Sequence, residues 1–334
     1  MDRVDAFQRR NKVVGFPLAV IYKYFDDQGP YLAAILTYYT FIAIFPLMLI
    51  ASSLLGFLLQ GNRDLQEDLL DSALRQFPIV GSQLGRPEGI RGSASAVVIG
   101  SLASLYGMLG LGQAAQNALN EVWAVPKNSR LNPFVGRARS LLMLALAGVT
   151  VVTITALSGF ASNLDALGLG LDEWLRWLGT LLSLALTATV LSLMMRFTTT
   201  RRPSFRTSLP GGLVIAVLWH GLQLVGGEYV RRVITVANEM NGVFALVLGL
   251  FALIYLASTF AVLGLEVNVV ADRRLYPRAL LTPFTDAVDL TDADRRAYDS
   301  YAKAQRHKGF EEVVVRFRDH ERPGDESPVE RPGE

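Results

Sequence analysis

Residues 240–265 read MNGVFALVLGLFALIYLASTFAVLGL, a stretch that contains no Asp, Glu, Lys or Arg. Five further stretches share this property: 28–62, 92–120, 140–164, 177–195 and 207–227. A bilayer core about 30 Å thick requires roughly 20 mostly apolar residues per helix. Only helices and closed barrels satisfy their backbone hydrogen bonds in lipid. Buried helices of a soluble protein are the alternative, but they rarely run this far without a charge, so we predict an all-α integral membrane protein.

All 32 Lys and Arg and all 30 Asp and Glu residues of the 334-residue chain lie outside these six stretches. The predicted bundle covers residues 31–270. Its six transmembrane helices are expected at about 31–59, 94–122, 140–163, 176–196, 208–228 and 243–269. The first 27 residues are too charged for a signal peptide, so the first apolar run is expected to stay as a transmembrane helix. The chain has no Cys, which excludes disulfides and thiolate metal sites.

The placement of positive charge predicts the orientation of the bundle. Of the 32 Lys and Arg residues, 25 lie in the N-terminal segment, the second and fourth loops and the C-terminal tail. Cytoplasmic loops retain positive residues. We therefore expect both termini in the cytoplasm and a location in the bacterial cytoplasmic (inner) membrane. Membrane lipids are the expected partners, with anionic lipid at the Arg-rich cytoplasmic loops.

The segments flanking the bundle have patterns of their own. Residues 1–30 form a cytoplasmic segment with an interfacial helix from Phe16 to Phe25, where Pro17 suits a first helical turn. The first external loop, 60–92, has a possible short helix over 64–77. Residues 271–334 form a small cytoplasmic tail, with a capping box at Thr291–Asp294 opening a helix to about Gln305. A strand over 310–317 and a disordered end over 321–334 complete it.

Polar residues inside the predicted spans supply the candidate site. The second span carries five at i, i+3, i+4, i+7 and i+8, which places them on one helical face: Gln113, Gln116, Asn117, Asn120 and Glu121. The candidates on other spans are Tyr38, Tyr39, His220, Gln223, Glu228, Tyr255, Thr259, Glu266 and Asn268. Pro46 is expected to kink the first span. Such side chains are costly in lipid, so they serve either as interhelical hydrogen bonds or as the lining of a polar cavity.

The inventory of reactive residues argues against catalysis. The three histidines, at 220, 307 and 320, have no metal-ligand spacing. No G-x-S-x-G elbow, P-loop or dinucleotide-binding glycine pattern occurs in a suitable context. We therefore expect no enzyme activity, no cofactor, no metal and no nucleic-acid partner.

Four short segments stand out: Leu32–Thr40 followed by Phe45-Pro46-Leu47, Ala118-Leu119-Asn120 with Val122-Trp123 and Val125-Pro126, Leu209-Pro210-Gly211-Gly212 through Leu218-Trp219, and Leu263-Gly264-Leu265-Glu266-Val267-Asn268. Together they resemble the YihY/BrkB family of bacterial membrane proteins. Leu265 stands where the family pattern has a small residue. The resemblance covers roughly residues 15–272 and implies a six-span inner-membrane protein with cytoplasmic termini. The family has carried a ribonuclease label, and some members are linked to envelope or serum resistance.

Three functions are compared on this basis. The first is a transport-like bundle that handles a lipid-like, amphipathic or small polar solute through an intramembrane polar cavity, with Glu121 and Glu266 as charge gates or proton-coupled groups. The second is a non-catalytic membrane scaffold for envelope integrity or resistance, in which the polar face is dry and fully paired. The third, a membrane ribonuclease, is disfavoured because the sequence has no clustered metal ligands.

Overall fold

The structure, a computed structural model, describes residues 2–58, 94–132, 134–146, 148, 173–201, 203–229, 239–280 and 288–317. Within these ranges every regular element is a helix. The predicted external loop with its short helix over 64–77 and the predicted disordered end lie outside the described residues. The predicted strand over 310–317 is wrong, because residues 311–317 form no regular element and no neighbouring strand supplies the hydrogen bonds that a sheet requires.

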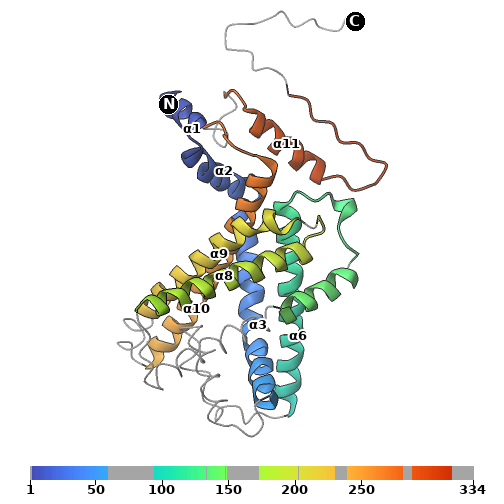
Figure 1. Ribbon diagram of the computed structural model, residues 1–334. Coiled ribbons are helices and arrows are strands. Elements are labelled where there is room, and N and C mark those ends of the chain that lie inside the picture. Colours follow the sequence, from blue (N-terminus) through green and yellow to red (C-terminus); the bar gives the residue numbers. More distant parts are fainter. Residues whose placement is uncertain are drawn as a thin grey trace, which may run out of the picture.

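Long helices form the body of the molecule (Figure 1). They are α3 (Gly29–Leu58), α6 (Ala94–Val122), α8 (Glu173–Thr198), α9 (Phe205–Tyr229) and α10 (Glu239–Arg273). A further helix over residues 134–146 lies between α6 and α8 in the chain and begins before the expected residue 140. The remainder of the third predicted span lies outside the described residues.

Three segments of these helices are long and apolar enough to cross a membrane: Trp177–Thr198, Phe205–Gly226 and Val247–Arg273. Gly29–Ile44 of α3 is a shorter apolar segment. This composition agrees with the predicted membrane protein. The division into six spans and the cytoplasmic position of the termini stay predictions. Pro46 lies within α3, and the kink expected there is likewise a prediction.

The N-terminal segment forms two helices, α1 (Asp2–Arg10) and α2 (Lys12–Asp26). Asn11 caps α2, and its side chain accepts a hydrogen bond from the Val13 N–H. Because α2 begins at Lys12, Pro17 lies inside the helix and not in its first turn, contrary to our expectation. Gln28 adopts a positive φ of 56° in the turn between α2 and α3.

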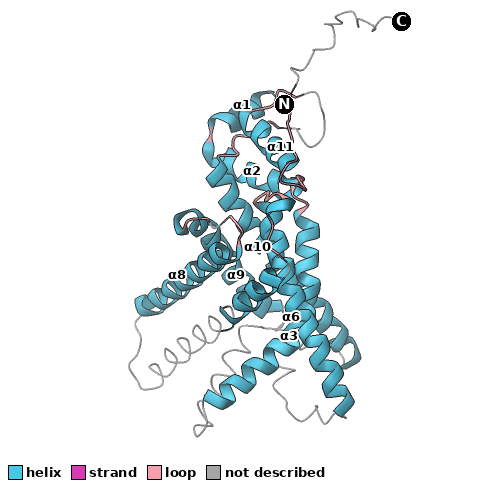
Figure 2. Ribbon diagram, turned by 90° about the vertical axis from the view of Figure 1, so that its right-hand side faces the viewer, coloured by secondary structure: helices cyan, strands magenta, loops and turns pink. Residues whose placement is uncertain are grey.

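The C-terminal tail returns to the N-terminal helices (Figures 1 and 2). Its helix α11 (Asp292–Ala304) begins at the predicted capping box, in which Thr291 and Asp294 exchange hydrogen bonds with each other's backbone. Together α1, α2, residues 274–280 and α11 form a unit that we call the cap. The cap lies at one end of the bundle, so the two flanking segments of the sequence form one structure.

Candidate functional site: an apolar cavity beside a buried charge cluster

A cavity of about 340 Å³ lies among the long helices. It is lined by residues of α3, α6, residues 134–146, α8, α9 and α10, and nearly all of its walls are apolar. Three of its lining residues have polar side chains: Thr40, Trp219 and Ser258. Small side chains on α6 and α10, including Ala115, Ala257 and Ala261, leave the space open.

None of the polar residues predicted for the site lines this cavity. This cavity is therefore apolar, and the predicted polar cavity stays a prediction. The predicted polar side chains differ in how they are paired and exposed.

The polar stripe of α6 is divided between a packed side and an open side. Gln116 and Asn120 are buried, Gln113 and Asn117 are exposed, and Glu121 is half-buried. The five residues span an arc of the helix wide enough to cross the edge of the packed surface. They consequently do not act as one face.

The two buried amides of this stripe hold neighbouring segments together. Gln116 donates hydrogen bonds to the Gly136 carbonyl at 2.6 Å and to Ser140 Oγ at 2.9 Å. Asn120 Oδ1 accepts one from Thr200 Oγ1 at 3.1 Å. Glu121 forms an ion pair with Arg130 at 2.8 Å. These residues connect neighbouring segments of the chain, in line with the first of the two readings that the sequence left open.

Two of the sequence segments that resemble the YihY/BrkB family meet where α9 crosses α10. A Cβ at Gly211 would lie 2.0 Å from the Gly264 carbonyl oxygen, so the helices approach through bare backbone. Asn268 Oδ1 accepts a hydrogen bond from the Gly211 N–H at 2.7 Å, and its amide donates to Met195 Sδ. Leu265 is buried and lines the cavity, while the adjacent Gly264 provides the close approach.

The next residue of α10, Glu266, belongs to a buried charge cluster that we define as Lys23, Asp27 and Glu266. All three side chains are nearly inaccessible to solvent. Lys23 Nζ lies 3.3 Å from Glu266 Oε2 and also forms an ion pair with Asp27. Burial alone lowers the pKa of Lys23, but the carboxylates of Glu266 and Asp27 outweigh it and the net shift is upward. Burial raises the pKa of Asp27.

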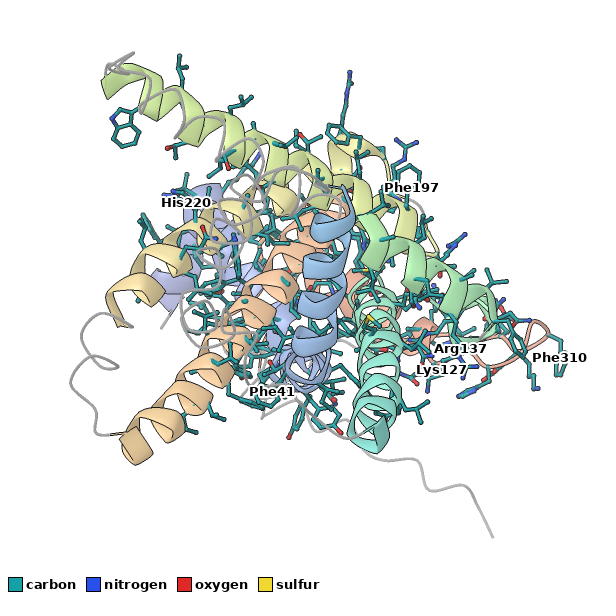
Figure 3. The ribbon with its side chains drawn as sticks, turned by 90° about the horizontal axis from the view of Figure 1, so that it is seen from below. Phe41, Lys127, Arg137, Phe197, His220 and Phe310 are labelled. Carbon is teal, nitrogen blue, oxygen red and sulfur yellow. The ribbon has the colours of Figure 1, made fainter. Side chains whose placement is uncertain are left out.

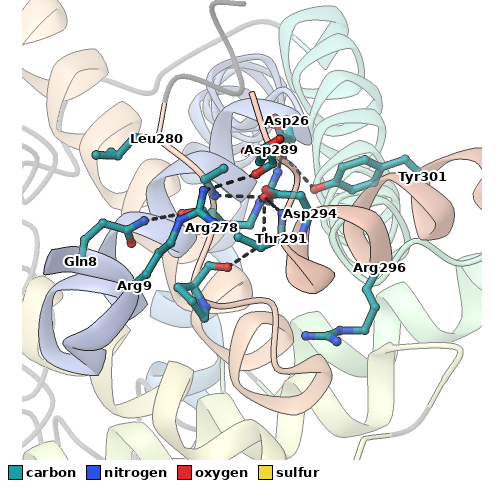
Figure 4. Close-up of polar contacts among 12 residues, drawn as sticks. Gln8, Arg9, Asp26, Arg278, Leu280, Asp289, Thr291, Asp294, Arg296 and Tyr301 are labelled. Atoms are coloured by element: carbon teal, nitrogen blue, oxygen red, sulfur yellow. Dashed lines mark hydrogen bonds and ion pairs between the residues drawn. The ribbon is translucent and has the colours of Figure 1, made fainter. Parts of the chain in front are cut away.

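A second buried pairing holds the cap together (Figure 4). Arg278 is almost fully buried and forms ion pairs with Asp294 and, at 3.0 Å, with Asp26. Burial opposes its charge, but Asp26 and Asp294 raise the pKa of Arg278, so it stays protonated. The Arg278 carbonyl accepts a hydrogen bond from Gln8 of α1 at 2.5 Å. Tyr301, whose pKa is raised by burial, donates to Asp26 at 3.4 Å.

The sequence candidates on the other helices do not converge. His220 is exposed, Gln223 is half-buried, and the side chain of Glu228 lies outside the described residues. Figure 3 shows His220 on a different side of the bundle from Lys127 and Arg137. Of the remaining four, Tyr38 and Tyr255 are exposed, whereas Tyr39 and Thr259 are half-buried. The rings of the neighbouring Tyr38 and Tyr39 lie 5.1 Å apart.

Sequence reasoning missed Lys23, Asp27 and Arg278. One signal was available, because Lys23 and Asp27 stand four residues apart, the spacing of an ion pair on a helix. The burial of this pair depends on Glu266, which is distant in the sequence. Arg278 gave no such signal, since its partners come from α2 and α11.

Long apolar helices of this kind define a membrane protein. The sequence model of the family described as Virulence factor BrkB matches residues 20–286, so the chain belongs to the BrkB family. The protein is similar to the Inner membrane protein YhjD of Escherichia coli (strain K12), with 23% identity over 269 residues that cover 74% of this chain and 78% of the relative. No solved structure matches the chain.

Proposed function

We propose that this protein binds a lipid-like molecule in the apolar cavity and handles it in a transport-like, non-enzymatic way in the bacterial inner membrane. The observation that carries the proposal is the lining of the cavity, which has three polar side chains among its 22 residues. Such a surface offers dispersion contacts to an acyl chain and few hydrogen bonds to a small polar solute. Of the substrate classes considered from the sequence, the lipid-like one is therefore favoured.

The size of the cavity supports an occupant. Its volume of about 340 Å³ lies within the range of roughly 300–1,000 Å³ that is usual for ligand pockets. Apolar cavities of this kind exclude water and accept apolar ligands. An acyl chain supplied by the surrounding bilayer would fill this space with apolar contacts.

Native mass spectrometry tests whether the cavity holds lipid. Ala261→Phe places a large side chain into the cavity, whereas Ala252→Phe on the exposed side of the same helix serves as the matched control. The protein purified in mild detergent is expected to retain one lipid, to lose it in Ala261→Phe and to keep it in Ala252→Phe. Equal lipid retention in both folded variants would contradict the proposal.

A transport role is tested separately in proteoliposomes with a fluorescent phospholipid. The wild-type protein is expected to move the probe between leaflets, and Ala261→Phe is expected to slow this movement at least tenfold relative to Ala252→Phe. Binding without any movement of the probe would support a lipid-binding role and contradict the transport step.

A specific observation favours the scaffold as the second candidate function. The buried amides of Gln116 and Asn120 are paired with protein groups, as expected for a static junction between helices. In a scaffold, envelope partners would bind the cap or the external loop, and Ala261→Phe would leave the phenotype of the cell unchanged.

A further inference from the structure

The buried charge cluster of Lys23, Asp27 and Glu266 has more negative than positive groups. Two carboxylates contact a single ammonium, and the side chains of Lys23 and Glu266 are 1% or less exposed. With all three groups ionised, the cluster would hold one uncompensated negative charge away from solvent. An unpaired buried charge is strongly unfavourable.

The hydrogen bonding of Glu266 shows the same imbalance. Among the described residues, no donor reaches hydrogen-bond geometry with either Glu266 oxygen, although both oxygens are buried. The Asp27 and Glu266 carboxyl groups both contact Lys23 Nζ, which brings them close to each other. Ionised carboxylates are acceptors only, so neither group can donate a hydrogen bond to the other.

The other groups around Glu266 do not supply this donor. From α2, Tyr24 and Lys23 face it, and Lys23 also lies 5.3 Å from the ring centre of Tyr301 in α11. The Tyr301 hydroxyl donates to Asp26. Arg273, about two helical turns further along α10, donates to the Trp123 carbonyl. The sequence of α3 contains no charged residue, and α9 contributes the backbone of Gly211.

We propose that Asp27 and Glu266 form a proton-binding site, in which one shared proton bridges the two carboxyl groups and Lys23 neutralises the remaining charge. The proton supplies the missing donor and brings the cluster to neutrality. A metal cation is disfavoured as the ligand, because the Lys23 ammonium already contacts both carboxylates and would repel it. The site joins the cap to α10, so proton release is expected to weaken that junction. This proposal does not rest on lipid binding in the cavity.

Infrared spectroscopy of the full chain in lipid nanodiscs tests the site directly. A protonated carboxyl group has its own carbonyl stretching band, which is expected to persist at pH 7 and to disappear as the pH is raised. The band is expected to be lost in Glu266→Gln and in Asp27→Asn. It should remain in Glu121→Gln, whose carboxylate is partly exposed and paired with Arg130.

The absence of the band from the wild-type protein at pH 7 would overturn the proposal. This measurement needs no variant, so the proposal can be tested even if the variants misfold. Persistence of the band in both folded Glu266→Gln and Asp27→Asn would also overturn it. Exchange of potassium for sodium is expected to leave the band unchanged, and its loss in sodium would identify a metal site instead. The protection factor of α2 in hydrogen exchange, which removes the intrinsic pH dependence of the rate, is expected to fall with rising pH in the wild type and to stay constant in Glu266→Gln.

Discussion

Gln113 and Gln116 lie one helical turn apart on α6, and the same type of side chain has a different role at each position. Gln116 is buried and donates two hydrogen bonds to the helix over residues 134–146, whereas Gln113 is exposed. Polar residues inside membrane bundles contribute through such bonds, at roughly 0.6 kcal/mol on average and up to about 1.7. Exposure and pairing therefore decide what each amide contributes.

The substitution Gln116→Leu is expected to lower the free energy of unfolding by about 1–2 kcal/mol, because it removes both bonds and leaves the Ser140 hydroxyl with fewer partners. The matched change Gln113→Leu removes no internal bond and is expected to lie within about 0.5 kcal/mol of the wild type. Thermal unfolding in detergent compares the two. Equal destabilisation by both changes would contradict the division of the stripe.

The buried positive charge of Arg278 is neutralised by ion pairs with two carboxylates, Asp26 and Asp294. Arg278→Met is expected to destabilise the cap by about 3–5 kcal/mol, because Asp294 stays buried without its cation. The exposed pair of Lys303 and Asp299 provides the control, and Lys303→Met is expected to change stability by less than about 1 kcal/mol. Hydrogen exchange in α1 and α11 measures the effect. Protection of both helices that survives Arg278→Met would show that the pairing is dispensable.

At the scale of elements, α9 and α10 cross with their backbones in close contact. The contact is made by two glycines, Gly211 and Gly264. Gly211→Ala would place a Cβ against the Gly264 carbonyl, so the helices must separate. Overpacking of this kind costs about 1–3 kcal/mol. Gly221, on the same helix, has open space around it, and Gly221→Ala is expected to be neutral or slightly stabilising. Unfolding temperatures of the two variants check this, and similar values would argue against the crossing.

The helices themselves were largely predictable from charge-free length. The second predicted span, 94–122, coincides with α6, and the sixth lies inside α10. The capping box located α11, because its chemistry is local. The division of the α6 stripe was not predictable, since spacing gives the angular position of a residue but not the edge of the packed surface. The strand over 310–317 failed because alternation alone does not supply a pairing partner.

At the scale of the whole molecule, the cap unites segments from both ends of the chain. Asp5 of α1 accepts a hydrogen bond from the Leu280 N–H at 3.0 Å, and Arg9 donates to the Asp289 carbonyl. Sequence patterns predict that these segments lie on the same side of the membrane, but they carry no information on the contact between them. The apolar cavity could not be predicted from the sequence either. Its lining residues are of types found throughout apolar helices, and the cavity depends on how the helices pack in space.

The orientation of the molecule can be tested with single cysteines, since the chain contains none. Asn62→Cys, in the predicted external loop, is expected to react with a membrane-impermeant maleimide in intact cells. Gly309→Cys, which follows α11 and has open space around it, is expected to react only after the membrane is opened. Labelling of Gly309→Cys in intact cells would reverse the predicted topology.

The central claim is that the apolar cavity holds an acyl chain, and photolabelling measures this most directly. A phospholipid with a diazirine in its acyl chain is incorporated with the protein into nanodiscs, irradiated, and the labelled residues are identified by peptide mass spectrometry. We expect labels on cavity residues such as Met195 and Ala257, with loss of these labels in Ala261→Phe. Labels confined to outward-facing residues such as Leu181 and Leu182, with none in the cavity, would contradict the account.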